Sequence, residues 1–328
     1  INMSNNIKII KKEINYFLLI NFLLIAFTSI FLFLSISKPN NSELISSFSI
    51  LFMYIPAFSA IVVLKKVSNY KFDSTVDKFL KFFAITTIVR IVISIAETFL
   101  IYSSIISSTI DTLTSVYLLA VVLYNEFQFE VLNLSLSKNF KKVLGILLIF
   151  LILIIVRNII DKEGLSINVV NKFVTVFINI IINLCFGFNL FFGEEFGWRY
   201  FLQPRLQKIY GKKFGVLILG FIWGIWHLPL CVTLYSPETP FYCVISQISY
   251  CTFIGIFLGY TYMKTKNLWA PILIHLVNNT VSIILGGSIE SIFTLESLLW
   301  SILVNAILFL PFLFAKEYKA NNYDESSN

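Results

Sequence analysis

Three charged residues interrupt the end of a long apolar run, at Glu194, Glu195 and Arg199. On a helix, Glu195 and Arg199 lie four residues apart with the acid first, which is the favourable order for an ion pair. Glu194 is rotated by about 100° from its neighbour and points elsewhere. We therefore predict that Arg199 holds Glu195, whereas Glu194 is free to accept a proton.

Both histidines of the chain, His227 and His275, lie within apolar segments. Trp223 precedes His227 by four residues, so we expect its indole to pack against the imidazole. Asn279 follows His275 by four residues and projects from the same helix face. A lone buried histidine is more often structural, but ionisable residues inside a membrane helix are costly and usually functional. Together these residues favour a reaction centre.

This set of side chains contains what the hydrolysis of a peptide bond needs. The reaction requires an activated water, an acid for the leaving amine, and donors for the developing oxyanion. Glu194 can take a proton from water, and His227 can orient that water or pass the proton on. His275 and the side-chain amide of Asn279 can both donate hydrogen bonds to an oxyanion. A nucleophilic Ser or Cys is not needed.

A zinc mechanism is the alternative for the same atoms. Glu194, His227 and His275 are a catalytic zinc set, with water as the fourth ligand. The sequence has no HExxH motif, so the three ligands would come from separate helices. Asn279 is an unusual zinc ligand and a good oxyanion donor. We therefore favour the mechanism that requires no cofactor and keep divalent zinc as the alternative.

The elements that must position these residues are membrane helices. Of the 328 residues, 57% are hydrophobic and 13% are charged, and the mean hydropathy is +0.83. Such a chain cannot cover a soluble protein with polar surface, so we expect an all-α, polytopic transmembrane helix bundle with about 8–10 spanning helices. The 112–130 segment is the weakest candidate and could be interfacial. The ten candidate segments are 16–37, 44–64, 82–106, 112–130, 143–160, 173–192, 214–230, 241–263, 268–286 and 297–315.

The net charge of +7 reflects orientation in the membrane rather than binding of nucleic acid. Membrane proteins concentrate Lys and Arg in cytoplasmic loops. With the N-terminus inside, 20 of the 25 basic residues fall in inside segments and four in outside loops. We therefore predict cytoplasmic N- and C-termini, the lipid bilayer as a partner and no nucleic-acid partner. Richness in Ile, Asn, Lys and Phe indicates an AT-rich genome and a prokaryotic cell membrane.

We divide the chain into N-terminal transmembrane helices (1–142), a catalytic transmembrane core (143–315) and a polar cytosolic tail (316–328). The first apolar run is expected to be an uncleaved anchor. Arg90 and Glu97 are two helical turns apart and share a face, so we expect a structural role in which they pair with each other or with another helix.

If every helix is straight, the candidate residues lie at different depths in the membrane and their side chains cannot meet. Glu194 lies 22 residues after Lys172, about 33 Å along a helix, whereas His227 and His275 follow inside-facing lysines by only 14 and nine residues. We therefore expect that the 173–206 helix is tilted or starts later, or that the 200–213 stretch folds back at Pro204 and Gly211.

Three stretches, "GEEFGWRYFLQPRL", "WGIWHLPL" and "LWAPILIHLVNN", resemble the motifs of the CAAX-type intramembrane endopeptidases of the CPBP family, which includes type II CAAX prenyl endopeptidases. The family patterns are EExxxR, FxxxH and HxxxN, and the similarity covers roughly residues 180–283. Trp223 replaces the usual Phe, which keeps an aromatic wall. Tyr200 stands where many relatives have Gly.

The resemblance implies that Glu194 activates water, that His227 assists, and that His275 with Asn279 stabilises the oxyanion. Glu195 and Arg199 would support the site. The implied function is an intramembrane endopeptidase acting on a membrane-associated peptide or protein. The family includes members with roles in bacteriocin immunity and in processing prenylated C-termini, and prenylated substrates are not expected in a prokaryote.

Two other functions stay open at this point, as does the oligomeric state. One is a non-catalytic immunity or scaffold protein that binds a peptide in the same cavity. The other is a proton-coupled transporter that uses Glu97, Glu194 and the histidines as a relay. Transporters often contain repeats with broken helices at corresponding positions, and the sequence shows no such repeat.

Overall fold

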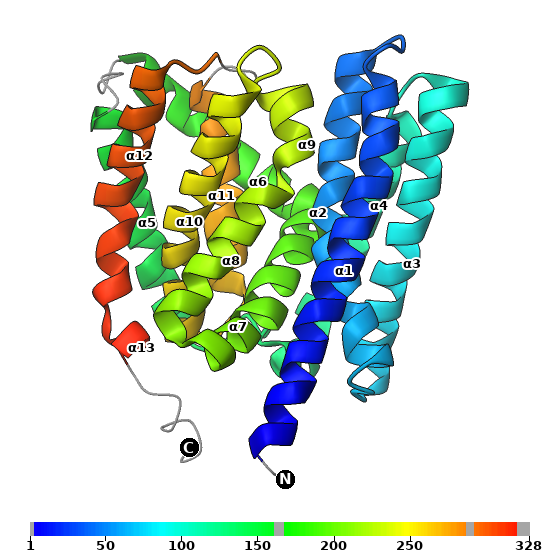
Figure 1. Cartoon of the computed structure of the whole chain (residues 1–328), viewed down its shortest axis with the longest axis vertical. Helices are drawn as coiled ribbons and strands as arrows, with labels where there is room; N and C mark the ends of the chain where they lie inside the picture. The colour runs from blue at the N-terminus through cyan, green and yellow to red at the C-terminus, as the bar shows by residue number, and fades with distance from the viewer. Residues whose placement is uncertain (1–2, 161–166, 287–291, 320–328) are drawn as a thin grey trace.

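Long apolar helices dominate the computed structural model, which describes residues 3–160, 167–286 and 292–319. The axes of most of the long helices are roughly aligned with one another (Figure 1), and these residues contain no strand. The α-helices are α1 (Met3–Ser35), α2 (Asn41–Lys66), α3 (Ser74–Ala96), α4 (Ile105–Tyr124), α5 (Phe140–Ile160), α6 (Ile167–Glu195), α7 (Gln203–Tyr210), α8 (Lys212–Trp226), α9 (Leu228–Leu230), α10 (Pro240–Thr265), α11 (Trp269–Gly286), α12 (Leu295–Phe309) and α13 (Lys316–Lys319). The π-helices are η1 (Glu97–Ile101), η3 (Phe196–Leu202) and η4 (Cys231–Tyr235), and the 3₁₀-helices are η2 (Gln128–Leu132) and η5 (Leu310–Phe314).

Seven helices in the described part of the chain are long and apolar enough to cross a membrane. The bent pair Lys212–Trp226 and Leu228–Tyr235, with an angle of 40°, would make an eighth span. The polytopic helical bundle is thereby confirmed, and the chain is an integral multi-pass membrane protein. The doubtful 112–130 segment overlaps α4, which is one of the seven, and its last residues belong to η2. The seven are Asn6–Ser35, Asn41–Lys66, Ser74–Ile101, Ile105–Tyr124, Val174–Tyr210, Pro240–Thr265 and Leu295–Phe314.

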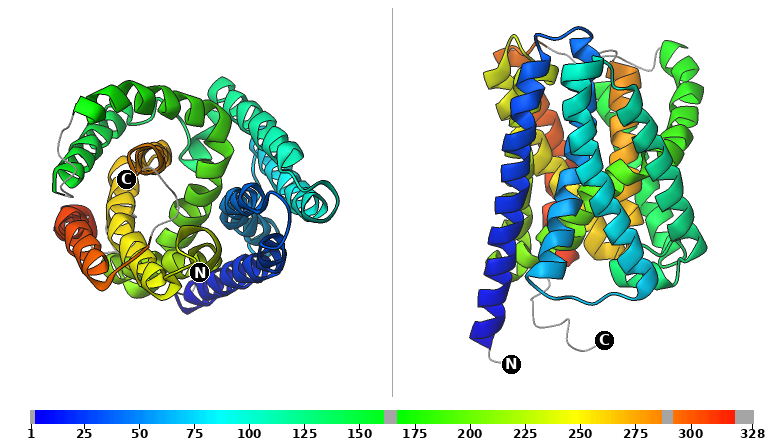
Figure 2. Two further views of the ribbon diagram at one scale, coloured as in Figure 1. Left: turned by 90° about the horizontal axis from the view of Figure 1, so that it is seen from above. Right: turned by 90° about the vertical axis from the view of Figure 1, so that its right-hand side faces the viewer.

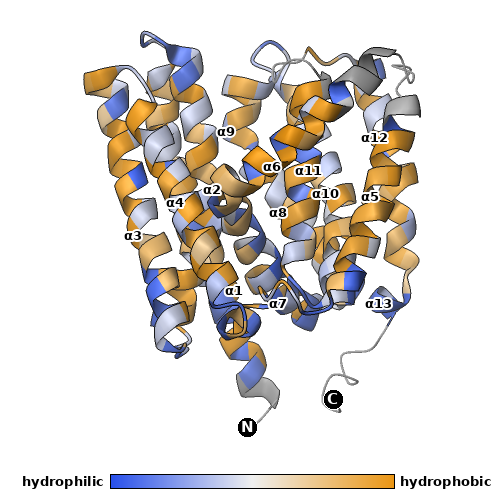
Figure 3. Cartoon of the chain, turned by 180° about the vertical axis from the view of Figure 1, so that it is seen from behind, coloured by the Kyte–Doolittle hydropathy of each residue, from blue (hydrophilic) through white to orange (hydrophobic). Residues whose placement is uncertain are grey.

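Apolar residues make up most of the long helices (Figure 3), and many of their large side chains are exposed on the outside of the bundle. On α5, for example, Leu148 and Ile152 are about 60% exposed. Exposure of this kind fits a surface that faces lipid, because hydrocarbon chains solvate apolar side chains as well as a protein core does. Of the predicted polar tail, residues 320–328 lie outside the described residues.

A buried polar network joins the N-terminal helices to α6. Arg90 pairs with Asp111 of α4, with Nε 2.9 Å from Oδ1, and its Nη2 donates to Ser47 of α2 over 2.9 Å. Tyr54 of α2 donates to the same Asp111 oxygen over 2.6 Å and accepts from Asn189 of α6. Arg90 therefore pairs with another helix, which was one of the two expected arrangements.

Glu97, in contrast, accepts hydrogen bonds from Ser107 at the start of α4, and its oxygen lies 2.9 Å from the Ser107 backbone nitrogen. It therefore has a structural position of its own near the α3–α4 turn and does not share an ion pair with Arg90.

The segment that carries the two glutamates is a continuous helical run. α6, η3 and α7 together form an unbroken apolar span, Val174–Tyr210, of 37 residues. The predicted late start is wrong, because α6 begins at Ile167. The predicted break at Pro204 is also wrong, because proline is tolerated in the first turn of α7. The break comes at Gly211, the second residue at which the 200–213 stretch was expected to fold back, and its φ of 81° lies in the region that glycine adopts readily.

α11, which carries His275 and Asn279, lies inside the ring of helices seen from above (Figure 2), against α5, α6 and α10. The loop before it is fixed by the 133–139 connection. Asn267 donates to the Ser135 and Lys138 carbonyl groups over 2.8 and 2.6 Å, and the Trp269 indole donates to the Leu134 carbonyl over 2.9 Å. These bonds fix the start of α11 relative to the first half of the chain.

Candidate active site

Two glycines allow the segment with the glutamates to approach α2 closely. A Cβ atom on Gly193 would collide with the carbonyl oxygen of Met53, and a Cβ on Gly197 would lie 2.5 Å from the carbonyl carbon of Pro56. Small residues four positions apart let membrane helices pack backbone to backbone. Glu194 and Glu195 lie between these glycines in sequence, and both are buried.

A second pair of glycines fixes the segment with His227. A Cβ on Gly220 would lie 2.5 Å from the Cα of Thr252, and one on Gly224 would collide with Ile248. Both contacts are with α10, so α8 and α10 pack without side chains between them at these points. Trp223 belongs to the last two turns of α8, and His227 is the C-cap of that helix.

Glu195 has partners in two of the three motifs. Its Oε2 lies 3.2 Å from Nε of Arg199, and its Oε1 accepts from Arg199 Nη1 over 3.3 Å. The predicted pair is therefore confirmed. Oε1 also lies 2.7 Å from Nδ1 of His275, across 80 residues of sequence. The side chains of Glu195 and Arg199 are completely buried, so this ion pair is shielded from solvent.

Within the described residues, Glu194 has no cationic hydrogen-bond partner, and two indoles donate to it instead. The Nε1–H of Trp223 donates to its Oε2 over 2.8 Å, and the Nε1–H of Trp198 donates to the same oxygen over 3.3 Å. Glu194 is 3% exposed. Trp198 was not among the predicted site residues, although it follows Glu194 by four residues and therefore shares its face.

Trp223 is the point where the three motifs meet. The guanidinium of Arg199 lies 4.4 Å from the centre of its ring. The ring centres of His275 and His227 lie 5.6 and 5.8 Å from that of Trp223. The predicted packing of indole against the His227 imidazole is thus confirmed. The same indole also contacts Glu194 and His275, which lie on two other elements.

Both histidines have their Nδ1 atoms occupied. Nδ1 of His227 lies 2.8 Å from the Trp223 carbonyl oxygen, which can only accept, so Nδ1 carries the proton. Nδ1 of His275 donates to the Glu195 carboxylate in the same way. In each neutral ring Nε2 is then the basic nitrogen, and it is the atom left for chemistry.

Asn279 is half-buried, and its Oδ1 accepts from Asn278 Nδ2 over 3.2 Å. Asn278 is held in turn by the Tyr250 hydroxyl, which donates to its Oδ1 over 2.7 Å. Because Oδ1 of Asn279 is engaged as an acceptor, its amide N–H groups are the part available to a substrate.

Glu194, His227 and His275 are the ligands of the zinc alternative. Among the residues that the structure describes, no three His, Cys, Asp or Glu side chains are grouped so that they could hold a metal ion. One oxygen of Glu194 accepts two indole N–H groups, and Nδ1 of each histidine is bound elsewhere. These bonds leave the second Glu194 oxygen and both Nε2 atoms, and zinc-bound histidines commonly donate their other N–H to a carboxylate or carbonyl group. The zinc alternative therefore requires these three groups to come closer together than in the described conformation.

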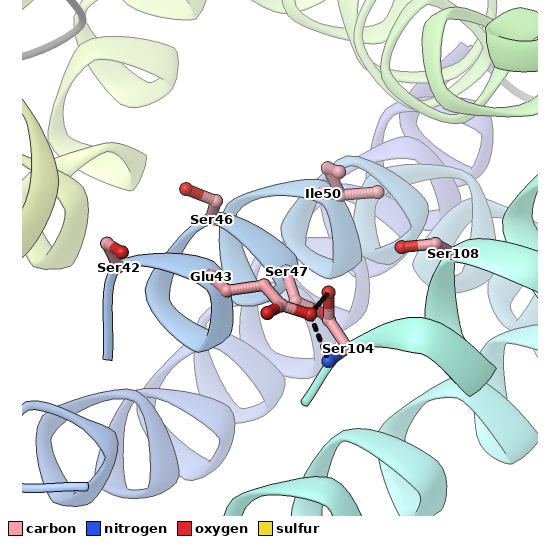
Figure 4. Close-up of a pocket in the computed structure, with 7 residues that line it drawn as sticks. All are labelled: Ser42, Glu43, Ser46, Ser47, Ile50, Ser104 and Ser108. Carbon is pink, nitrogen blue, oxygen red and sulfur yellow. Dashed lines mark hydrogen bonds between the residues drawn. The ribbon is translucent and has the colours of Figure 1, made fainter. Parts of the chain in front are cut away.

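A cavity of about 440 Å³ lies at the ends of α2 and α4, away from the three motifs. Its wall is mostly serine, and Glu43 is held there by Ser104, whose backbone nitrogen and hydroxyl lie 2.6 and 2.8 Å from one carboxylate oxygen (Figure 4). None of the predicted site residues lines this cavity. The residues that do are Ser42, Glu43, Ser46, Ser47, Ile50, Ser104 and Ser108.

Comparison with known families agrees with the motifs. Residues 173–281 match the family described as type II CAAX prenyl endopeptidase Rce1-like. The match covers about a third of the chain and includes all three motifs. The predicted resemblance to CAAX-type proteases is thereby confirmed, and a CAAX-type intramembrane protease is supported as the general function. No curated protein and no solved structure matches the chain.

Proposed function

We propose that this chain is an intramembrane endopeptidase that hydrolyses a peptide bond of a membrane-associated peptide or protein, with water activated by Glu194. The observation that carries the proposal is the meeting of the three motifs around Trp223, which contacts Glu194, His227 and His275. These residues lie far apart in sequence and on separate helices, and the family match covers all of them.

In the proposed mechanism Glu194 is the general base. It takes a proton from water while the water oxygen attacks the carbonyl carbon of the peptide. The same carboxyl group then gives that proton to the leaving nitrogen as the C–N bond breaks. Nε2 of His227 accepts a hydrogen bond from the water and orients it, because its Nδ1 proton is already bound to the Trp223 carbonyl. General-base steps of this kind typically contribute about 10²–10⁴-fold to the rate.

The developing oxyanion is bound by His275 and Asn279. Since Nδ1–H of His275 points at Glu195, donation from Nε2 requires the protonated imidazolium. The Glu195 carboxylate, 2.7 Å from Nδ1, would stabilise that cation, and Arg199 lies on the other side of the same carboxylate. The side-chain amide of Asn279 supplies the second donor. Removing one donor of this kind commonly costs about 10²–10³-fold in kcat.

The Glu194→Gln variant tests the proposal, because glutamine keeps the size of the side chain and cannot take the proton. The wild-type chain and the variant are expressed in the same bacterial host, and new peptide termini in membrane proteins are identified by mass spectrometry. We expect termini that depend on the wild-type chain and disappear in Glu194→Gln. The control is Glu130→Gln, which changes an exposed glutamate of η2 and should cleave normally.

Other results would support other functions. Cleavage at full rate by Glu194→Gln contradicts the proposed base. A peptide that binds equally well to both proteins and is cleaved by neither indicates a scaffold or immunity protein. Proton flux in liposomes that depends on Glu194 indicates a transporter. A zinc chelator that abolishes wild-type cleavage, together with zinc measured in the purified protein, would establish the zinc alternative.

A further inference from the structure

We infer that Trp223 and Trp198 act as positioning residues that hold one oxygen of Glu194, so that the other oxygen is presented to the attacking water. This inference rests on the proposed function. Both indole N–H groups donate to Oε2, over 2.8 Å from Trp223 and 3.3 Å from Trp198. A free glutamate carboxyl rotates broadly about its last torsion. Two donors that converge on one oxygen restrict that rotation.

The two indoles come from different elements. Trp198 lies on η3, four residues after Glu194, whereas Trp223 lies on α8. The two donors can therefore reach Glu194 together only when α8 is packed against η3. Glu194 reaches its bound orientation only in that packed arrangement.

Both rings are fixed by their surroundings. Trp198 is fully buried, and its ring packs edge-on against Phe17 and Trp226, with centres 5.7 and 6.0 Å apart. Trp223 is 3% exposed, and the Arg199 guanidinium lies over its face at 4.4 Å. A cation over the ring is attracted to its π-system and restrains the indole further. Rigid donors of this kind lose little entropy when they bind the carboxylate.

The FxxxH pattern has phenylalanine at the position where this chain has Trp223. The hydrogen bond from this position to Glu194 is therefore a departure from that pattern. Phenylalanine at this position would preserve the aromatic wall but cannot donate a hydrogen bond. Trp223 therefore keeps the aromatic wall and adds a hydrogen bond to the proposed base. Replacing Trp223 by Phe would restore the residue of the family pattern and, in this chain, would remove the shorter of the two bonds to Glu194.

Trp226 supplies a matched control. It is buried like the other two, yet its indole N–H has no hydrogen-bond partner in the part of the chain that the structure describes. Its change to Phe removes an N–H group of the same kind from the same neighbourhood, without removing a bond to Glu194.

The pH dependence of the reaction separates positioning from packing. N–H donors favour the ionised carboxylate, so losing them lets Glu194 keep its proton to higher pH. The charged or titratable groups that act on Glu194 are Glu195, Arg199 and His275, and the neutral Tyr235 and Cys251 lie near it; the Phe variants change none of these residues. The acid limb of the kcat profile should therefore move to higher pH.

The experiment uses the purified full-length protein in phosphatidylethanolamine and phosphatidylglycerol vesicles. The probe is an internally quenched peptide anchored by one palmitoylated cysteine. We expect Trp223→Phe to lower kcat about 10–100-fold, with a smaller change in KM and the acid limb at higher pH. Trp198→Phe should show the same effect more weakly because its bond is longer. Trp226→Phe, which changes packing against Trp198 and His227, should leave the acid limb at its wild-type pH and lower kcat less than Trp223→Phe does.

Equal kcat values and pH profiles for Trp223→Phe and Trp226→Phe would overturn the inference. If Trp223→Phe does not fold, benzothienylalanine at position 223 keeps the shape of the indole without the N–H, and the same comparison applies. Loss of activity in Glu194→Gln with a normal Trp223→Phe contradicts the indole inference alone. Full activity in Glu194→Gln contradicts the proposed function and the inference with it.

Discussion

Glu195 connects two of the sequence motifs through one carboxylate. Its oxygens contact Arg199 on one side and Nδ1 of His275 on the other, with His275 at 2.7 Å. A buried carboxylate with a single cationic partner would serve only as part of an ion pair. With His275 as a second partner, Glu195 also fixes the tautomer and orientation of the imidazole that is proposed to bind the oxyanion.

The Glu195→Gln variant should therefore lower kcat about 10–100-fold, because the neutral amide no longer stabilises the His275 imidazolium. A kinetic assay on the vesicle-bound peptide measures this effect, and the thermal midpoint of unfolding reports any loss of folded protein. The control is Glu317→Gln, since Glu317 is also a glutamate near a cation, with Lys264 at 3.9 Å, but lies on α13. Wild-type kcat in Glu195→Gln would rule out this role.

Close backbone contacts between helices place the reactive side chains. Gly193 and Gly197 allow the α6–η3 segment to lie in close contact with α2. Gly220 and Gly224 allow the same contact between α8 and α10. Each pair has the spacing of one helical turn, which is known to favour close packing of membrane helices. The proposed base and the Trp223 indole are therefore carried on two segments that each lie in close backbone contact with a neighbouring helix.

Gly197→Ala should destabilise the protein by about 1–3 kcal/mol, because its methyl group would overlap the backbone of Pro56. The thermal midpoint of unfolding in detergent checks this, and cleavage should fall together with the folded fraction. Gly145→Ala is the control, since a Cβ on Gly145 meets nothing within 4 Å and lies on the exposed face of α5. A variant at Gly197 as stable as the one at Gly145 would show that this contact is not tight.

At the scale of the whole molecule, the start of α1 and α13 lie at the same end of the bundle (Figure 1). The distribution of Lys and Arg predicts that this end faces the cytoplasm. The α1–α2 connection then faces the outside, and the α2–α3 connection faces the inside. This orientation is a prediction from charge, and it decides from which side a water-soluble part of a substrate approaches.

Labelling of single cysteines in intact cells tests the orientation. Starting from a variant without the four native cysteines, Ser37→Cys in the α1–α2 connection should react with a membrane-impermeant maleimide. Ser74→Cys at the start of α3 should react only after the membrane is opened. Both serines are exposed, so accessibility to reagent is not limited by burial. The reverse labelling pattern would show that the topology is opposite to the predicted one.

Contacts within one helix were predictable from spacing. The Glu195–Arg199 pair and the packing of Trp223 on His227 are both four residues apart, and both are present. Trp198 also follows Glu194 by four residues, so the same spacing predicts the bond from its indole N–H to Glu194. Likewise, the glycine spacing around the two glutamates is visible in "GEEFG".

Contacts between helices were not predictable in this way. The Trp223 bond to Glu194 spans 29 residues and the Glu195 bond to His275 spans 80, and neither follows from any local spacing. The break that was expected at Pro204 is absent because a proline in the first turn of a helix lacks only an N–H that needs no partner there. Residue order sets the angles between side chains along one helix, whereas the pairing of distant side chains depends on how closely the helix backbones pack.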